Sequence, residues 1–408
     1  MATPGRAPIP NAATTTFPPV PALLLAMLQV SSHVSDLIFS PGSHPHVEVS
    51  GQLVPVKIPG LSSVLNPEST QRIAAELMGD NPTAIAMLKQ QGSCDISYSL
   101  PGTARFRVNI FVQRGSHAIV MRVIPKSIPS FAELKLAEEL ARIVDLKNGI
   151  VLVTGPTGSG KSSTLAAILD RINETKAYHI LTIEDPVEFM HRHKRSIVHQ
   201  RELHSDTPSF ALALRAALRQ APKVILVGEM RDKETIEIAL EAAETGHLVL
   251  STLHTTDASK TVERVVGVFP LTEQQTIRSR FSRSFRYIVS QRLLPRKGGT
   301  GRVAAMEILK STMRTREYLE KGEVEGKSLL DAMRDGDTEG MQHFDGEIEK
   351  LIRADMIDYD TAMAYATNPG NLRLQLADLL GEAPATAAAN PRPAEKAKPK
   401  RETQLEIE

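Results

Sequence analysis

From residue 149 onward, wholly apolar runs alternate with stretches that carry apolar residues at helical spacing. The runs GIVLVTG, HILTI, VILV and HLVLST are each of strand length. Between them lie SSTLAAILDRI, SFALALRAALR and KETIEIALEAAE, which are typical of amphipathic helices. Repeated strand and helix units of this kind predict an α/β fold with a parallel sheet covered on both faces. In such folds ligands bind at the carboxyl ends of the strands.

The preceding part of the chain has a mixed pattern. It predicts helices at 22–29 and 67–78, strand pieces at 47–49 and 53–56, and a hairpin from RFRVNIFVQ to HAIVMRVIP. We therefore expect a small α+β domain at 22–126 and a linker helix within 127–147. The α/β domain would span 148–381, with helices after Lys310. The stretches 1–21 and 382–408 are rich in Pro, Ala or Thr and are predicted to be disordered.

Composition narrows the function classes. The 48 basic and 47 acidic residues nearly cancel, so no nucleic-acid partner is expected. The single cysteine, Cys94, cannot form an internal disulfide or a cysteine-based zinc site, and we interpret it as a small buried apolar residue. The apolar run at 23–30 is too short to cross a bilayer. These features predict a cytoplasmic protein.

The segment GPTGSGKS directly follows one predicted strand and opens a helix. Its glycines allow backbone N–H groups to converge on phosphate oxygens, while the lysine adds a positive charge for the β and γ phosphates. The serine after the lysine is placed to hold Mg²⁺. The alternative, a glycine-rich turn without a ligand, does not account for this strand and helix context. The predicted ATP-binding residues are Gly155, Pro156, Thr157, Gly158, Ser159, Gly160, Lys161, Ser162 and Ser163.

Acidic residues and histidines follow the other predicted strands. IEDPVE contributes Glu184, Asp185 and Glu188, although acids at strand ends also serve as helix caps or solvated loops. Glu229 closes VILV, where an unpaired carboxylate beside an apolar strand would be costly. His247 and His254 flank the strand HLVLST, and either a structural role or a role near the phosphates is compatible with that position.

Taken in order, these motifs resemble those of the secretion ATPase superfamily. The further segments VHQRE, RVVGVFP and GGTGRVAAMEIL support this, and the set is most similar to the PilT and PilU retraction motors of type IV pili. The resemblance implies a RecA-like P-loop NTPase domain preceded by a PAS-like domain.

The resemblance also implies roles for individual residues. Glu188 would orient the attacking water, with support from Glu184 and Asp185, and Glu229 would organise Mg²⁺ and its water shell. His247 and His254 would sense the γ phosphate and couple it to the subunit boundary. Arg107 and Arg122, with Arg105 nearby, would reach the nucleotide from the first domain, although solvated strand positions are the plain alternative.

In function, the resemblance implies a hexameric ATPase that drives pilus retraction and twitching motility at the inner-membrane face. Its partners would be an inner-membrane platform protein and a paralogous pilus ATPase. An accessory PilU-like subunit with little activity alone, or a secretion or pilus-assembly ATPase, are the alternatives. The arginine-rich stretch 278–292 is expected to be a helix, either with a solvated face or in contact with a neighbouring subunit or the membrane.

Overall fold

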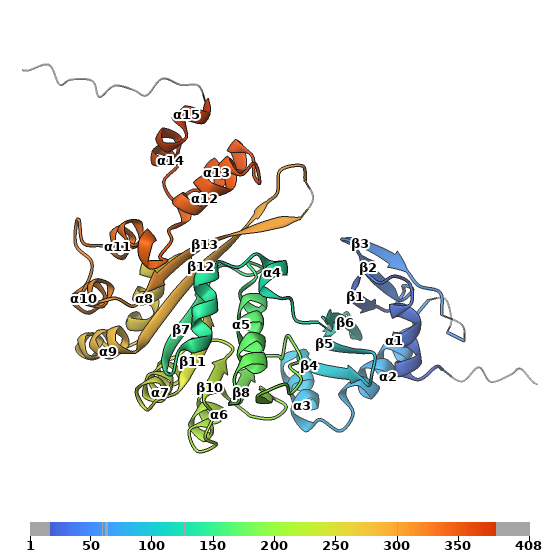
Figure 1. The fold of residues 1–408 in the computed structure, drawn as a ribbon. Helices are drawn as coiled ribbons and strands as arrows, with labels where there is room; N and C mark the ends of the chain where they lie inside the picture. Colours follow the sequence, from blue (N-terminus) through green and yellow to red (C-terminus); the bar gives the residue numbers. More distant parts are fainter. Residues whose placement is uncertain (1–16, 59, 62–63, 126, 300, 381–408) are drawn as a thin grey trace, which may run out of the picture.

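The computed structural model describes residues 17–380 except 59, 62–63, 126 and 300, and Figure 1 shows two sheets joined by a linker. Most of the first predicted tail and all of the second lie outside the described residues. Within the described part of the chain, no helix is both long enough and apolar enough to cross a membrane.

The first sheet is antiparallel and has the strand order β3-β2-β1-β6-β5-β4. Its strands are β1 (Val34–Phe39), β2 (His46–Val49), β3 (Gln52–Pro55), β4 (Ser93–Leu100), β5 (Ala104–Gln113) and β6 (Ser116–Ile124). Helices α1 (Val20–Leu28), α2 (Pro67–Met78) and α3 (Pro82–Gln91) share a core with it. Asn66 and Asn81 cap α2 and α3, each followed by proline at the first helical position. Sequence patterns predicted α2 with these bounds, but they missed β1, α3 and β4.

The linker is not one helix. It consists of α4 (Phe131–Leu134) and the 3₁₀ helix η1 (Glu138–Asp145), with extended backbone beyond. Lys135 adopts a left-handed conformation with φ of 52°, which ends α4. Glu139 then fixes η1 to the second sheet, because its carboxylate accepts a hydrogen bond from the Tyr287 hydroxyl at 2.7 Å and pairs with Lys310 at 2.8 Å.

The second sheet has the order β13-β12-β7-β11-β10-β8-β9. All neighbours are parallel except β12 and β13, which form an antiparallel hairpin at one edge. The strands are β7 (Gly149–Thr154), β8 (His179–Glu184), β9 (Ile197–Glu202), β10 (Val224–Val227), β11 (Leu248–Leu253), β12 (Phe285–Pro295) and β13 (Arg302–Lys310). The predicted apolar runs are thus the central strands.

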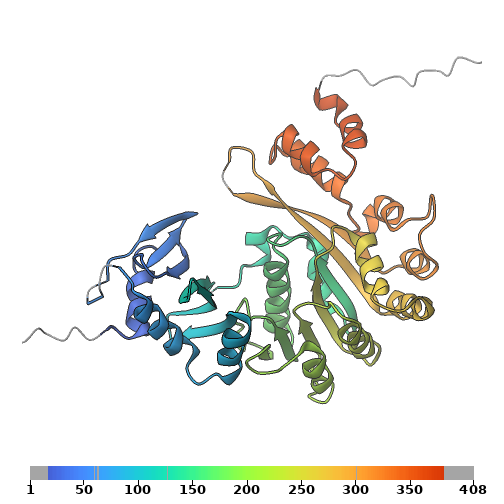
Figure 2. The same ribbon diagram turned by 180° about the vertical axis from the view of Figure 1, so that it is seen from behind.

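Helices cover both faces of this sheet, as Figures 1 and 2 show from opposite sides. Alternate residues of β7 enter two separate cores, Ile150 and Leu152 in one, Val151 and Val153 in the other. The first core includes α6 (Phe210–Ala217), α7 (Lys233–Glu244), α8 (Ala258–Gly267) and α9 (Leu271–Ser284), and the second includes η1 and α5 (Lys161–Thr175).

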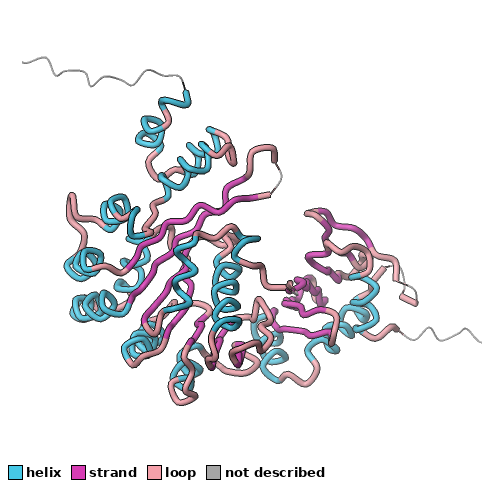
Figure 3. The backbone as a smooth tube through the Cα atoms, in the orientation of Figure 1, coloured by secondary structure: helices cyan, strands magenta, loops and turns pink. Residues whose placement is uncertain are grey.

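The expectation of one basic helix at 278–292 is wrong. Helix α9 ends at Ser284, and the next residues form β12, which pairs with β7 on one side and β13 on the other. Pairing in the sheet therefore overrides the local helical pattern. Figure 3 shows β12 and β13 extending beyond the other strands. After them, as predicted, the chain is helical: α10 (Met313–Lys321), α11 (Leu329–Asp335), η2 (Asp337–Glu339), α12 (Phe344–Arg353), α13 (Tyr359–Tyr365), α14 (Pro369–Gln375) and α15 (Ala377–Leu380).

Candidate active site

The phosphate loop leaves the carboxyl end of β7 and enters α5, as the sequence predicts. Gly155 has φ of 144° and lies so close to β12 that an added Cβ would meet the Gln291 carbonyl oxygen and, at 2.6 Å, the Ser159 Oγ. Gly160 has φ of 90° and lies against the Gln291 side chain. These two positions require glycine, because close packing and a left-handed backbone coincide there.

Lys161 is buried at the start of α5. Its Nζ donates to the carbonyl oxygens of Gly155 at 2.9 Å and Pro156 at 3.0 Å, and lies 3.5 Å from His254 Nδ1. Burial lowers the pKa of Lys161, whereas the nearby Glu229 and Glu188 carboxylates oppose that shift. The two carbonyl oxygens accept the hydrogen bonds that Lys161 would donate to phosphate oxygens in a nucleotide complex.

The loop after β8 carries the predicted acidic cluster. Glu184 accepts hydrogen bonds from the Thr182 hydroxyl at 2.6 Å and the Gln200 amide at 3.1 Å, and burial raises its pKa to about 7. Asp185 and Glu188 are exposed. Glu188 thus lies at the exposed side of the cavity, while hydrogen bonds hold Glu184 in its wall.

Glu229 follows β10 and is largely buried. Its Oε2 pairs with Arg231 at 2.6 Å and lies 3.3 Å from His254 Nε2. His254 therefore lies between Lys161 and Glu229, with one ring nitrogen toward each. Glu229 thus has a basic residue on each side, Arg231 and His254, and Lys161 lies beyond the histidine.

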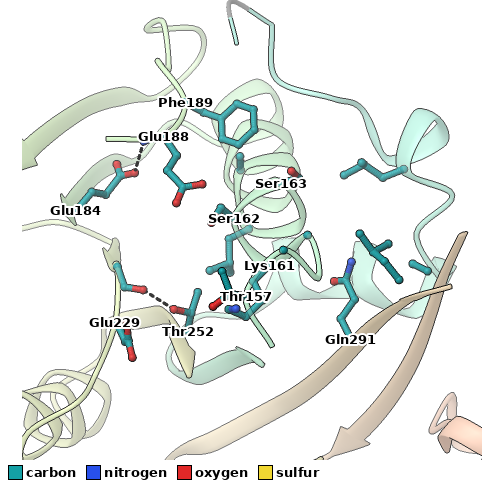
Figure 4. Close-up of a pocket in the computed structure, with 18 of the residues that line it drawn as sticks. Thr157, Lys161, Ser162, Ser163, Glu184, Glu188, Phe189, Glu229, Thr252 and Gln291 are labelled. Atoms are coloured by element: carbon teal, nitrogen blue, oxygen red, sulfur yellow. Dashed lines mark hydrogen bonds between the residues drawn. The ribbon is translucent and has the colours of Figure 1, made fainter. Parts of the chain in front are cut away.

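These groups surround a cavity of about 730 Å³, a size that suits a small-molecule ligand. Figure 4 shows Glu184 and Glu188 on one side, Thr252 on a second and Gln291 on a third, around Lys161. The linker contributes Glu133, Leu134, Lys135 and Leu136 to the lining, and the hairpin contributes Leu293, Arg296, Arg302, Val303 and Ala304.

The three arginines of the first domain lie in different places. Arg107 lines the cavity. Arg105 instead pairs with Glu202 at 2.6 Å, and Arg122 pairs with Asp36 at 2.9 Å within its own domain. The structure therefore brings one of the three to the cavity.

Of the two predicted histidines, only His254 lines the cavity. His247 stands at the opposite end of β11, where its Nδ1 lies 2.9 Å from the Ala242 carbonyl oxygen. Six residues of β11 separate the two, and a strand advances about 3.3 Å per residue. A single protomer cannot place His247 beside the phosphate loop, so any role for it would lie elsewhere.

Several lining residues gave no sequence signal. Gln291 accepts a hydrogen bond from Thr164 of α5 at 2.9 Å and packs on Gly160, although it lies far along the chain. Arg231, Arg296 and Arg302 add positive charge to the cavity. Arg231 could have been suspected from its place beside Glu229, but Gln291 and the hairpin arginines depend on how β12 pairs with β7.

The residues present fit Mg²⁺ bound with a nucleotide. Among the described residues, no group of three or more His, Cys, Asp or Glu side chains forms a self-sufficient metal site. Magnesium bound with nucleotides takes only one or two protein ligands and completes its shell with water and phosphate. Ser162 and Glu229 could supply oxygen ligands, and Glu184 and Asp185, at the end of β8, line the same cavity. Such an ion would neutralise phosphate charge.

Comparison with known proteins decides the family. Residues 26–343 match the family described as Type II/IV secretion system protein. The chain belongs to this family. It is 44% identical over 337 residues to the Pseudomonas aeruginosa protein named type IV pilus retractation ATPase PilT, which covers 83% of this chain and 95% of that relative. It is 38% identical to the type IV pilus ATPase PilU of the same organism, covering 86% and 90%.

Solved structures agree that this chain belongs to the secretion family. A crystal structure of the pilus retraction motor PilT with bound ADP has a TM-score of 0.77 and 40% identity, covering 86% of this chain and 98% of that one. The Legionella pneumophila ATPase DotB has a TM-score of 0.74 and 29% identity, covering 84% and 95%. The predicted family resemblance is confirmed, as are the fold class, a RecA-like domain after a small α+β domain, and the enzyme class, an ATP hydrolase.

Proposed function

We propose that this protein is an ATP-hydrolysing motor that drives type IV pilus retraction. The observation that carries the proposal is the match over 95% of the length of PilT. In this chain, Lys161, Glu188 and Glu229 line one cavity. Retraction is named for the relative PilT, whereas the six-membered ring and the platform partner are implied only by the family resemblance. A cytoplasmic position at the inner-membrane face belongs to the same proposal.

The proposed chemistry is attack of water on the terminal phosphorus of ATP. The phosphate loop and Lys161 hold the triphosphate, and Glu188 orients the water and accepts its proton. Glu229 and Ser162 would hold Mg²⁺, which would offset charge on the phosphate oxygens. Arg107 adds positive charge from the other domain. Phosphoryl transfer needs positioning and charge stabilisation, and this set provides both.

Movement would arise if nucleotide binding favours one arrangement of the two domains and hydrolysis releases it. Arg107 supports this, because it reaches the cavity from the first domain while the phosphate loop belongs to the second. Six protomers in a ring would convert such changes into displacement of a membrane platform protein. Sedimentation with and without nucleotide tests the ring, and a stable monomer under both conditions would contradict it.

The catalytic assignment is tested by phosphate release from purified protein with and without Mg²⁺. Glu188→Gln should lower kcat about 10²-fold to 10⁴-fold, the range typical of a lost general base. Glu263→Gln is the matched control, because this exposed glutamate pairs only locally with Lys260 on α8. Full activity in Glu188→Gln would refute the assignment of the base.

The biological direction of work needs a separate test. A deletion strain that keeps or accumulates surface pili but does not move supports retraction, whereas loss of pili supports assembly. The 38% identity to PilU favours one second candidate, an accessory subunit. Turnover that is low alone and appears only with a paralogous ATPase would favour that candidate.

A further inference from the structure

An ion pair between a half-buried arginine and a buried glutamate joins the first domain to the second. Arg105 of β5 donates from Nη2 to Glu202 Oε2 of β9 at 2.6 Å, across a separation of 97 residues. The side chains are only 23% and 6% exposed, respectively. A pair this sheltered is screened by solvent far less than an ordinary surface pair, so its loss has a larger effect.

The same carboxylate oxygen also holds the loop that carries the proposed base. Glu202 Oε2 accepts the backbone N–H of Val187 at 3.1 Å, and Val187 directly precedes Glu188. Glu202 is itself held in place, because its backbone N–H donates to Asp206 at 2.8 Å. One oxygen atom therefore contacts the first domain and the Glu188 loop together.

Gln200 holds the rest of this loop from the same face of β9, since residues two apart along a strand point the same way. Its Nε2 donates to Glu184 at 3.1 Å and to the Phe189 carbonyl oxygen at 2.9 Å, and its Oε1 accepts the His191 N–H at 2.8 Å. Both ends of the segment 184–191 are thereby fixed to β9. Only its middle, at Val187, depends on a group shared with the first domain.

We propose that Glu202 is a positioning residue that couples docking of the first domain to the placement of Glu188. If Arg105 withdraws, the buried carboxylate loses a charged partner and must turn toward water, which removes its hold on Val187. Among the described residues, the buried Arg105 Nε has no hydrogen-bond partner, so docking satisfies the guanidinium only in part. The inference rests on the proposed ATPase function.

A double-mutant cycle tests the coupling. Arg105→Ala and Glu202→Gln should each lower kcat about tenfold, and the double variant should fall no further, because both changes remove one interaction. KM should stay within about twofold, since the phosphate loop is untouched. Arg215→Ala and Glu234→Gln form the control cycle: this pair, 2.9 Å apart, joins two helices within the second domain. Unchanged kcat in Arg105→Ala, or tenfold losses that multiply, would overturn the proposal.

Hydrogen exchange provides a second readout that does not need turnover. In the full-length protein, the Val187 amide should exchange at least tenfold faster in Arg105→Ala than in the wild type, while amides of α7 keep their protection. Arg105→Lys should restore part of it, because an ammonium can still pair with Glu202. If wild-type protein fails to hydrolyse ATP, the proposed function falls, yet this measurement still decides the coupling. Equal Val187 exchange in the wild type and Arg105→Ala would refute it.

Discussion

Replacing Gly155 by alanine should displace the phosphate loop from β12. The new Cβ would collide with the Gln291 carbonyl oxygen, and it would lie 2.6 Å from Ser159 Oγ, closer than real Cβ contacts. Neither neighbour can easily withdraw: the first is backbone of a strand that is paired on both sides, and Ser159 is 3% exposed. The backbone itself would therefore have to move.

The expected loss in the free energy of unfolding has two contributions. Overpacking at such a site costs about 2 kcal/mol, and a non-glycine residue at positive φ adds about 1 to 2 kcal/mol. Gly155→Ala should therefore lower the free energy of unfolding by about 3 to 4 kcal/mol. Gly158→Ala is the matched control, because Gly158 has φ of 79° but nothing within 4 Å of the added Cβ. It should lose only the backbone contribution, about 1 to 2 kcal/mol.

Urea denaturation measures both variants, and calorimetric titration with ADP measures the consequence for binding. ADP binding should weaken about 100-fold in Gly155→Ala, equivalent to about 2.7 kcal/mol, because the N–H groups of the loop no longer converge. Equal losses of stability in the two variants would show that contact with β12 does not hold the loop in place.

Two further predictions follow from the buried carboxyls and from the histidines. Burial raises the pKa of both Glu184 and Glu307 to about 7. The folded protein thus retains protons that the unfolded chain has lost, and the free energy of unfolding should fall as pH rises from about 4.5 to about 7. Glu184→Gln and Glu307→Gln should each flatten this slope in urea titrations across that range, and an unchanged slope in both would be inconsistent with these pKa values. His254→Ala should weaken ADP binding by calorimetry, whereas His247→Ala should change it less than twofold in the monomeric chain; equal effects would contradict the separation along β11.

The sequence predicted those parts of the fold in which local pattern and tertiary environment agree. The central strands are continuous apolar runs because both faces are buried, and the phosphate loop has its own local geometry. Residues 285–292, the second part of the expected helix 278–292, were misjudged, since a basic, partly helical pattern becomes a strand only through pairing with β7 and β13. β1 and β4 have mixed burial along their lengths, so neither shows a clean alternation.

In the candidate site, the local motifs were predictable and the contacts between distant segments were not. Lys161, Glu188 and Glu229 each follow a predicted strand, so the edge at which they meet could be inferred. Arg105 and Arg107 lie two residues apart on the same face of β5, yet one pairs with Glu202 and the other lines the cavity. That difference depends on how the two domains dock, which no spacing in the sequence encodes.

Lys161 and Glu229 already have partners within the protein, and this bears on how nucleotide binding would be transmitted. Lys161 is held by two carbonyl oxygens and lies beside His254, which in turn lies beside Glu229, and Glu229 pairs with Arg231. Under the proposed function, an incoming phosphate would compete with these carbonyl oxygens for Lys161, and a metal ion would compete with Arg231 for Glu229. Both changes of partner would alter the surroundings of His254, because its Nδ1 faces Lys161 and its Nε2 faces Glu229. In that proposal His254 would contact both the group that holds the phosphate and the group that holds the metal, whereas His247 at the other end of β11 would contact neither.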